Sequence, residues 1–389
     1  MSKKRKLIRI TTVPGSLKTL LKGQHRFMSE NGYEVIGVSS EGKELHDVRE
    51  IEGVRVVALE MTRTISLFKD LKALWGFYWL CKKEIPLIVH SHTPKAGIVG
   101  MLGAKLAGVP IRLHTVAGLP LMEATGLKRW ILNIVEKLTY SCANRVYPNS
   151  KGLNDFILKN RFANKDKLKV IANGSSNGID TGVFSPQQIT LEQQNLLRDE
   201  LNISASDFVF VFVGRLVKDK GINELVTAFS RIKDKNVKLL LVGALEEDLD
   251  PLLPKTLDEI NSNENIIYAG WQSDVRQFFA IADALVFPSY REGFPNVVMQ
   301  AGAMGLPSIV TDINGCNEII IDKENGVIIP PKDEDKLYDA MHYFLDNHED
   351  LERMANNSRK MIVDRYEQQV VWDALLEEYR RLEKELIKS

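Results

Sequence analysis

The sequence has few cysteines and no long apolar segment. Cys81, Cys142 and Cys316 are the only cysteines, and they show no paired spacing. This argues against a disulfide framework or a zinc site and favours a reducing compartment, so we expect a cytoplasmic protein. No stretch approaches the roughly 20 apolar residues of a membrane span. The basic start MSKKRKLIRITTVPG is not expected to be a signal peptide, because its short apolar run is interrupted by an arginine and a proline.

The chain also lacks net charge, but its charges are unevenly distributed. Residues 1–185 contain 29 Lys and Arg against 15 Asp and Glu, whereas residues 186–389 contain 22 against 36. A basic half could contact anionic lipid headgroups or attract a phosphorylated substrate, although chance and a solvated surface would explain the same numbers. Nucleic acid is not an expected partner, because the basic residues are not interleaved with stacking aromatics.

At 389 residues the chain is too long for one ordinary core, which predicts two domains with a cleft between them. Short β-branched runs alternate with amphipathic stretches, and this α/β pattern of a doubly wound parallel sheet restarts halfway along the chain. The predicted strands are LIRITTV, YEVIGVS, VRVVAL, LIVHS, IRLHTV, NRVYPNS and KVIAN in the first half, and FVFVFVG, VKLLLVG, NIIYAG, ALVFPS, PSIVTD and GVIIPP in the second.

A polar segment separates the two series of strands. VFSPQQITLEQQNLLRDELNIS contains a proline and breaks the strand rhythm, which places the boundary near residues 185–202. We therefore assign residues 1–185 to the first domain and residues 186–365 to the second. The final segment, about 366–389, has an apolar stripe at helical spacing, so we expect a helix with one buried face.

Ligands of open parallel sheets bind beyond the carboxyl ends of the strands, so residues directly after strands are the first candidates for a site. In VFVGRLVKDKG, Gly214 lets the backbone approach a ligand. Arg215 and Lys220, five residues apart, could flank a diphosphate, although a lysine before a helix is more often simply solvated.

The stretch EGFPNVVMQ, which follows the strand ALVFPS, is a second candidate for a ligand-binding segment. Gly293, Phe294 and Asn296 offer backbone N–H groups at a helix start, which suits a phosphate or a sugar hydroxyl. Glu292 lies in the loop before this helix, and Gln300 lies eight positions further on.

Taken together and in order, these blocks resemble retaining GT-B glycosyltransferases of glycosyltransferase family four. TTVPGSLKTLLKGQHRFMSENGYEV, VHSHTPKAGIVGMLGAKLAGVP, HTVAGL, SSNGID, FVGRLVKDKGINEL and DINGCNEII are all similar to blocks of the bacterial capsular and surface-polysaccharide members. The resemblance covers nearly the whole chain. It implies two Rossmann-like domains facing a cleft, the first binding the acceptor and the second the nucleotide, with the helix of about 366–389 crossing back to the first domain.

The resemblance also implies a reaction. Such enzymes move a sugar from a nucleoside-diphosphate donor, usually UDP-linked, to a glycan acceptor, with retention and without a metal or other cofactor; a polyprenyl-diphosphate-linked glycan is one candidate acceptor here. Arg215 and Lys220 match the cations that neutralise the leaving diphosphate, where fixed charge stabilises most. Glu292 matches the first glutamate of the Glu-x7-Glu motif, which holds the donor sugar's hydroxyls. Gly293 and Phe294 match loop residues around the sugar and phosphates.

Gln300 departs from the family pattern, because the second glutamate of that motif accepts hydrogen bonds from the ribose hydroxyls. An amide has one acceptor oxygen and two donor hydrogens, so it can still bond a diol. Losing a charge-assisted bond could cost about 1–2 kcal/mol of donor binding. We therefore expect weaker ribose binding and intact chemistry.

In the first half, Gly15 and Ser16 lie where a helix should start after the first strand, in a loop that lacks the G-x-G-x-x-G fingerprint. The resemblance implies that this loop faces the donor phosphates and the acceptor, whereas an ordinary helix cap by Ser16 is the alternative. His114 follows the strand IRLH and resembles the family's histidine that touches the donor sugar. Two further loops are expected to shape the cleft and not to be catalytic: Asn149, Ser150 and Lys151 after RVYP, and Asn177 with Asp180 in SSNGID.

Two metal sites are considered and set aside. His90 and His92 alternate on one strand and would face the same way, but no third ligand accompanies them. Asp248 and Asp250 form a D-x-D, which fits an acidic, solvated loop better than a cation site.

Residues 66–83, SLFKDLKALWGFYWLCKK, place five aromatics among lysines. This composition suits a helix at a lipid headgroup surface and favours a peripheral contact with an anionic membrane, with a buried core helix as the alternative. Two other functions stay open: a UDP-sugar epimerase on the same fold, and a weakly active scaffold or partner of a transferase.

Overall fold

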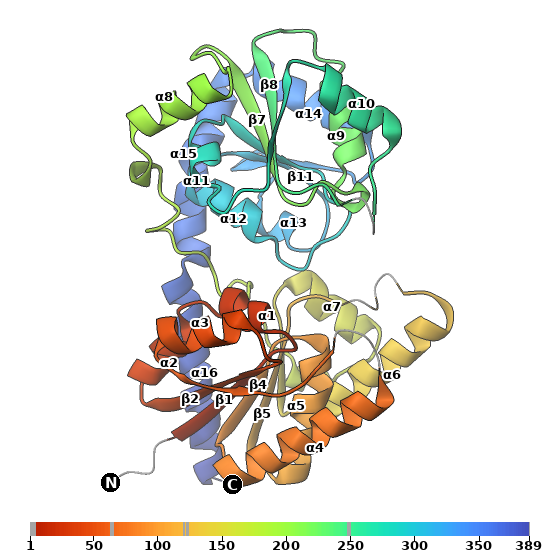
Figure 1. Ribbon diagram of the computed structural model, residues 1–389, viewed down its shortest axis with the longest axis vertical. Helices are drawn as coiled ribbons and strands as arrows, with labels where there is room; N and C mark the ends of the chain where they lie inside the picture. The colour runs from red at the N-terminus through yellow and green to blue at the C-terminus, as the bar shows by residue number, and fades with distance from the viewer. Residues whose placement is uncertain (1–4, 63–65, 120, 122–123, 247–249, 389) are drawn as a thin grey trace. The chain divides into compact units, whose positions relative to one another are not determined.

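The computed structural model describes residues 5–62, 66–119, 121, 124–246 and 250–388 (Figure 1). Its contacts divide the chain into two compact units. Unit 1 comprises Met1–Gly178 and Gln369–Ser389, and unit 2 comprises Ile179–Gln368. Each unit contains one parallel six-stranded sheet.

In unit 1 the strand order is β3-β2-β1-β4-β5-β6. The elements are β1 (Arg5–Ile10), α1 (Pro14–Leu20), α2 (Gln24–Glu30), β2 (Tyr33–Ser39), α3 (Lys43–Glu52), β3 (Arg55–Ala58), α4 (Leu67–Glu84), β4 (Ile88–Ser91), α5 (Pro94–Ala107), β5 (Ile111–Val116), α6 (Gly126–Cys142), β6 (Arg145–Pro148), α7 (Lys151–Lys159), η2 (Lys165–Lys167) and α16 (Gln368–Lys388).

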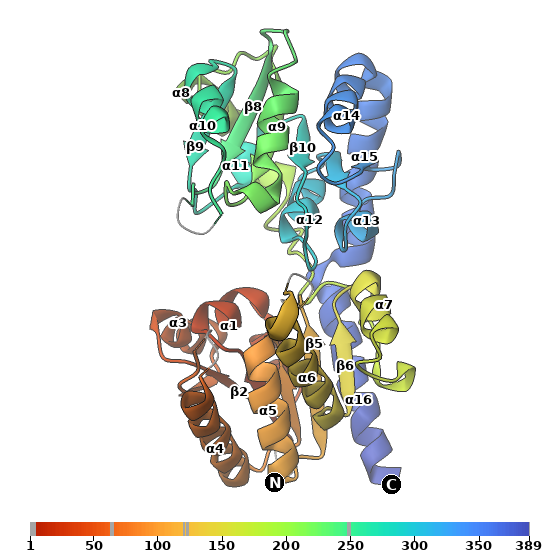
Figure 2. The ribbon, with the colours of Figure 1, turned by 90° about the vertical axis from the view of Figure 1, so that its right-hand side faces the viewer.

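Helices cover both faces of this sheet, which is why its strands read as continuous apolar runs (Figures 1 and 2). Ile8 and Ile10 of β1 face a core shared with α4 and α5. Leu7, on the opposite face, shares its core with Leu375 and Tyr379 of α16. The apolar stripe expected in the final segment is therefore buried against the sheet of unit 1.

One predicted strand is wrong. Residues 169–173, KVIAN, do not extend the sheet, because only one backbone bond continues the ladder, from Lys169 N to Val146 O at 3.1 Å. Ala172 then adopts a φ of 48°. Gly174 N bonds to Ile171 O at 2.9 Å, which closes a turn where the strand was expected.

In unit 2 the strand order is β12-β11-β10-β7-β8-β9. The elements are η3 (Pro186–Gln188), α8 (Leu191–Glu200), β7 (Phe208–Val213), η4 (Lys218–Lys220), α9 (Ile222–Phe229), β8 (Val237–Val242), α10 (Pro254–Ser262), β9 (Ile266–Gly270), α11 (Arg276–Ala280), β10 (Ala284–Phe287), α12 (Asn296–Ala303), β11 (Ser308–Thr311), α13 (Cys316–Ile319), β12 (Gly326–Ile329), α14 (Glu334–Asp346) and α15 (His348–Tyr366).

Both sheets have the same topology, in which the first and fourth strands of the unit are neighbours and the order runs outward from them in both directions. Ligands of doubly wound folds bind at this switch point, beyond the carboxyl ends of the two central strands. In unit 2 these strands are β7 and β10. The loops that follow them carry the candidate residues of the second half of the sequence.

Candidate functional site

Three loops of unit 2 pack together beyond its switch point. Tyr290 N, after β10, donates to Asp219 O, after β7, at 2.9 Å. Gly221 has a φ of 73°, and a Cβ there would lie 2.2 Å from Pro288 O, so only glycine allows these two loops to meet so closely. The loop after β11 joins them, since a Cβ on Gly315 would lie 2.7 Å from Gly293 O.

This packing brings Lys220 and Glu292 together. Their side chains form an ion pair, and each keeps only about a sixth of its surface exposed, 17% and 16%. The Lys220 Nζ atom also lies 5.6 Å from the ring centroid of Phe287. A pair that is mostly shielded from water is held more tightly than a surface pair, so these two groups have fixed positions.

Two further residues hold Glu292, and the sequence analysis assigned neither of them a role. Ser289 Oγ donates to Glu292 Oε1 at 3.1 Å, and Asn314 Nδ2 donates to the backbone oxygen of Glu292 at 3.2 Å. Burial, with a further contribution from Glu292, raises the pKa of the nearby Cys316 thiol far above its usual value, so this neighbour is uncharged. Ser289 lies two residues after β10 and Asn314 three residues after β11, and this position shortly after a strand is the signal that could have found them.

The structure does not pair Arg215 with Lys220 around one acidic group. Arg215 is exposed and forms its own ion pair with Glu246. Gly214, which precedes it, directly follows β7. Each of the two candidate cations for a diphosphate therefore has a carboxylate partner in the structure, Glu246 for one and Glu292 for the other.

The start of α12 has the form that an anion or hydroxyl site needs. Asn296 is its first residue and is exposed, and Pro295 at the N-cap supplies no side-chain hydrogen bond. Phe294 is buried and packs edge-on against Tyr366 at 5.4 Å, which fixes the loop. Gln300 is half-buried in the second turn of the helix. Its proposed contact with a ribose stays a prediction.

In unit 1, His114 lies inside β5 and not after it, since the strand continues to Val116, and its side chain is buried. Its Nδ1 bonds to Ser91 Oγ at 2.8 Å, and burial lowers its pKa to about 4, so the imidazole is neutral at pH 7. Gly97 is required beside it, because a Cβ there would lie 2.6 Å from Cε1 of His114. A contact of His114 with the donor sugar stays a prediction.

Ser16 does not cap α1, so the alternative role considered for this residue is wrong. The helix begins at Pro14 with Val13 as N-cap and no side-chain cap, so Ser16 lies inside the first turn and does not cap it. Proline is favoured at this position because its missing N–H is not needed there. A Cβ on Gly15 would meet nothing within 4 Å. Packing therefore does not require this glycine, and the ligand role of Gly15 and Ser16 stays a prediction.

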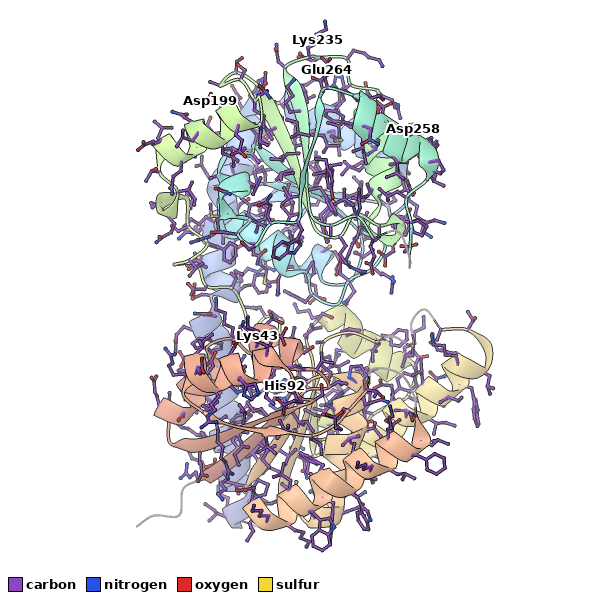
Figure 3. The ribbon with its side chains drawn as sticks, viewed as in Figure 1. Lys43, His92, Asp199, Lys235, Asp258 and Glu264 are labelled. Carbon is purple, nitrogen blue, oxygen red and sulfur yellow. The ribbon has the colours of Figure 1, made fainter. Side chains whose placement is uncertain are left out.

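The two histidines considered for a metal do face the same way. The rings of His90 and His92 lie 4.1 Å apart, and Figure 3 shows His92 within unit 1. Both ring nitrogens of His90 are engaged, Nδ1 with Tyr379 at 2.6 Å and Nε2 with Thr115 at 2.8 Å. Among the described residues, no three His, Cys, Asp or Glu side chains form a group that could hold a metal ion.

The second metal candidate can be placed only in part. Asp248 lies outside the described residues. Asp250 accepts a hydrogen bond from Asp219 N at 2.7 Å, which ties its loop to the turn beside Lys220.

Comparison with known proteins identifies the family. Residues 193–361 match the model described as "Glycosyl transferases group 1", and residues 24–174 match "Glycosyl transferase 4-like domain". The chain is 34% identical to the capsular polysaccharide biosynthesis glycosyltransferase CapM of Staphylococcus aureus, over 98% of this chain and 99% of that protein. It is 30% identical to UDP-Gal:alpha-D-GlcNAc-diphosphoundecaprenol alpha-1,3-galactosyltransferase of Escherichia coli, over 78% of each chain.

Solved structures show the same fold at lower identity. The glycosyltransferase of Rickettsia africae ESF-5 superimposes with a TM-score of 0.81 at 18% identity, covering 98% of this chain and 99% of that one. Anabaena Alr3699/HepE, solved in complex with UDP, gives 0.82 at 17% identity, covering 97% and 100%. These agree with the expected α/β fold of two parallel-sheet units. The chain belongs to the GT-B glycosyltransferases of the group 1 and 4-like families.

Proposed function

We propose that this glycosyltransferase moves a sugar from a UDP-sugar to a lipid-linked glycan, with retention and without a metal, during assembly of a bacterial surface polysaccharide. The observation that carries the proposal is the shielded Lys220–Glu292 pair beyond the switch point of unit 2, next to the start of α12. The full-length similarity to CapM supports the pathway. The name of the E. coli relative, which uses UDP-Gal and a diphosphoundecaprenol-linked sugar, supports the donor and the acceptor.

In this proposal the leaving diphosphate takes the place of two carboxylates. Lys220 and Arg215 exchange Glu292 and Glu246 for the phosphate oxygens, where their charge is already in position as the bond to the sugar breaks. The N–H groups at the start of α12 add hydrogen-bond donors. The released Glu292 contacts the sugar hydroxyls, and the leaving phosphate oxygen accepts the proton of the attacking acceptor hydroxyl.

The donor can be tested by thermal stabilisation in the presence of EDTA. We expect UDP at 100 times its Kd to stabilise the protein by about 2.7 kcal/mol, and we expect GDP and ADP to do much less. Gln300→Glu should tighten UDP binding by up to about tenfold, because a carboxylate accepts from both ribose hydroxyls. Absence of any shift with nucleotides would favour the scaffold function. Conversion of the UDP-sugar without an acceptor would indicate an epimerase.

We further propose that unit 1 binds the surface of an anionic membrane through α4 and α6. Both helices pack against α5 and lie on either side of it (Figure 2). One face of α4 is buried and the other is not: Phe68 is 89% and Trp79 62% exposed. On α6, Leu127 and Trp130 are similarly exposed, at 72% and 61%.

The charge around these apolar residues favours a lipid partner. Exposed lysines flank them, namely Lys69, Lys72, Lys82, Lys83, Lys128 and Lys137. Aromatic side chains between lysines suit the headgroup region of an anionic bilayer. None of the helices in the described part of the chain is long and apolar enough to span a bilayer, so the proposed contact is peripheral.

Binding to vesicles tests this surface. Sedimentation with vesicles containing about a third anionic lipid should retain the protein, and Trp79→Ser should weaken binding about tenfold, since burying one large side chain contributes roughly 1.5–3 kcal/mol. Trp271→Ser is the matched control, because Trp271 is 71% exposed but belongs to unit 2. Equal loss in both variants, or equal binding to neutral vesicles, would refute this assignment of the surface.

A further inference from the structure

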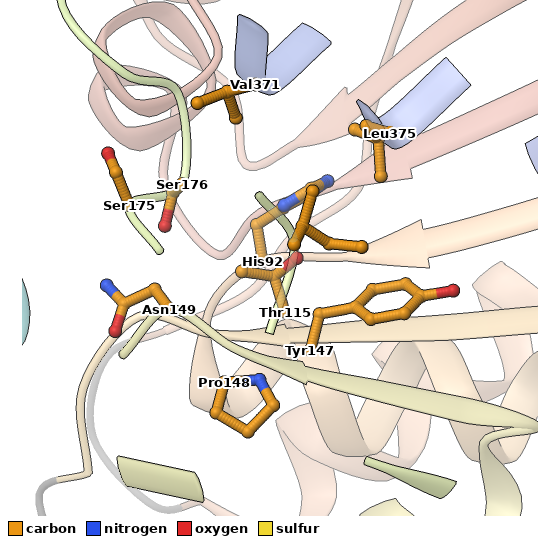
Figure 4. A pocket seen from close by; sticks show the side chains of 10 residues that line it. His92, Thr115, Tyr147, Pro148, Asn149, Ser175, Ser176, Val371 and Leu375 are labelled. Atoms are coloured by element: carbon orange, nitrogen blue, oxygen red, sulfur yellow. The ribbon is translucent and has the colours of Figure 1, made fainter. Parts of the chain in front are cut away.

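Unit 1 contains a small pocket whose lining includes none of the residues proposed above to bind the donor (Figure 4). It lies beyond the carboxyl ends of the neighbouring strands β4, β5 and β6, which is where ligands of such sheets bind. His92 follows β4 and Asn149 follows β6. Ser176 lies two residues before Gly178, where the first segment of unit 1 ends. Val371 and Leu375 of α16 form an apolar wall.

The polar atoms of this pocket lack partners. Both ring nitrogens of His92, the Oδ1 atom of Asn149 and the Oγ atom of Ser176 have no hydrogen-bond partner among the described residues. His92 is 3% and Asn149 5% exposed, so solvent around the protein does not satisfy them. Buried polar groups are nearly always hydrogen-bonded, so the free atoms indicate a missing group that bonds to them.

The neighbouring polar groups do not satisfy these atoms, because they form hydrogen bonds with other residues. Thr115 Oγ1 bonds to His90 at 2.8 Å, and the hydroxyl of Tyr147 donates to Glu378 at 3.2 Å. The amide nitrogen of Asn149 donates away from the free oxygen, to Ala117 O at 3.3 Å. The four unpaired atoms all belong to residues that line this pocket, and one small partner can bond to one of the two nitrogens of His92.

Charge and size define that partner. Burial, together with the charges of His90 and Arg9, lowers the pKa of His92 well below 6.5, so its ring is neutral at pH 7 with one donor and one acceptor nitrogen. Asn149 offers only an acceptor, and Ser176 can donate or accept. The cavity volume is about 20 Å³. Because a single water needs roughly 10–15 Å³, the space admits one hydroxyl-sized group and excludes a sugar ring or a phosphate.

We propose that this pocket seats one hydroxyl or hydroxymethyl group of the acceptor sugar and thereby selects the acceptor. A hydroxyl both donates and accepts, which matches Asn149 on one side and His92 on the other, and the apolar wall of Val371 and Leu375 suits a methylene. The inference rests on the proposed transfer to a glycan. A site built to bond a hydroxyl rejects an analogue that lacks it, because its own polar groups are then left unpaired.

Four simple methyl glycosides test the pocket directly. Methyl β-D-glucoside and methyl β-D-galactoside carry the hydroxymethyl group, whereas methyl β-D-xyloside and methyl α-L-arabinoside are the same rings without it. The imidazole signals of histidine-labelled protein are few, since the chain has seven histidines, and His92→Gln assigns the signal of His92. We expect the two hexosides to shift the His92 signal at concentrations at least about fivefold lower than the two pentosides.

A matched pair of variants completes the test. Asn149→Ala should abolish the preference for hexosides, whereas Asn154→Ala, the same change on the adjacent α7, should preserve it. Hydrogen exchange of the β5 and β6 amides that is unchanged from wild type shows that unit 1 of each variant is folded. Equal shifts with all four glycosides, or none, would overturn the inference and leave a pocket that holds only water. Failure of the proposed transferase function is seen separately, as absence of UDP binding by the wild-type protein.

Discussion

Lys220→Ala should lower kcat by about 10²–10³-fold, because removing one fixed group from the place where charge develops has that effect in other enzymes. Steady-state transfer to a lipid-linked acceptor, at saturating UDP-sugar, measures it. Lys218→Ala is the control, since Lys218 lies in the same η4 turn and is exposed. Similar losses in the two variants would show that general positive charge, and not the position of Lys220, matters.

Glu292→Gln tests the other half of the ion pair. Turnover should fall, since the amide cannot stabilise positive charge at the sugar. UDP itself should bind as tightly as before or more tightly, because Glu292 no longer competes with the diphosphate for Lys220. This split between binding and turnover distinguishes a role in chemistry from a structural one. Near-normal turnover would remove Glu292 from the mechanism.

Glu378→Gln should lower the free energy of unfolding of unit 1 by about 2 kcal/mol at pH 7. Burial alone would raise the pKa of Glu378, but hydrogen bonds from Arg381 and Lys169 outweigh it and lower the pKa to about 2. The full shift corresponds to about 3 kcal/mol, and we reduce it because both partners are nearly half exposed. Glu377→Gln, an exposed neighbour on α16, should change little.

The same residue predicts a pH dependence. A carboxyl group whose pKa is lower in the folded state stabilises the fold above its unfolded pKa of about 4.3. That contribution is lost as the pH falls from there towards 2, so the gap between wild type and Glu378→Gln should close over this range. Hydrogen exchange of the β5 and β6 amides measures unit 1 by itself, since a chain of two units need not unfold in one step. A gap that stays constant down to pH 2.5 would contradict the assignment.

The sequence predicted the fold well because parallel strands buried on both faces leave an unmistakable apolar signal. Twelve of its thirteen predicted strands form, and the exception, KVIAN, has the right composition but lacks a hydrogen-bonding neighbour beyond its first residue. Composition reports burial, whereas strand pairing depends on where the edge of the sheet lies. The helix stripe of residues 366–389 was equally clear, since its period could be read directly from the sequence.

The sequence identified individual residues of the candidate site but not the contacts between them. Lys220 and Glu292 were both named, but their pairing depends on the close approach of two loops at Gly221, which spacing along the chain does not reveal. Arg9 is a stronger example. In the sequence it only interrupts an apolar run, yet it is fully buried in β1 with its guanidinium bonded to Gln24. The sequence pattern does not reveal that a charged residue is buried inside a strand, because this depends on the side chains that surround it.

The position of α16 has a consequence for the order in which the protein is made. Leu375, Tyr379 and Leu382 complete the core that Leu7 begins, although nearly the whole chain separates them. During synthesis, the part of this core that α16 covers therefore stays exposed while all of unit 2 is made. A chain that stops anywhere in unit 2 keeps this part of the core exposed, and exposed apolar surface favours aggregation. Synthesis therefore starts with unit 1, but the core of unit 1 is completed only after the sequence of unit 2 has been made.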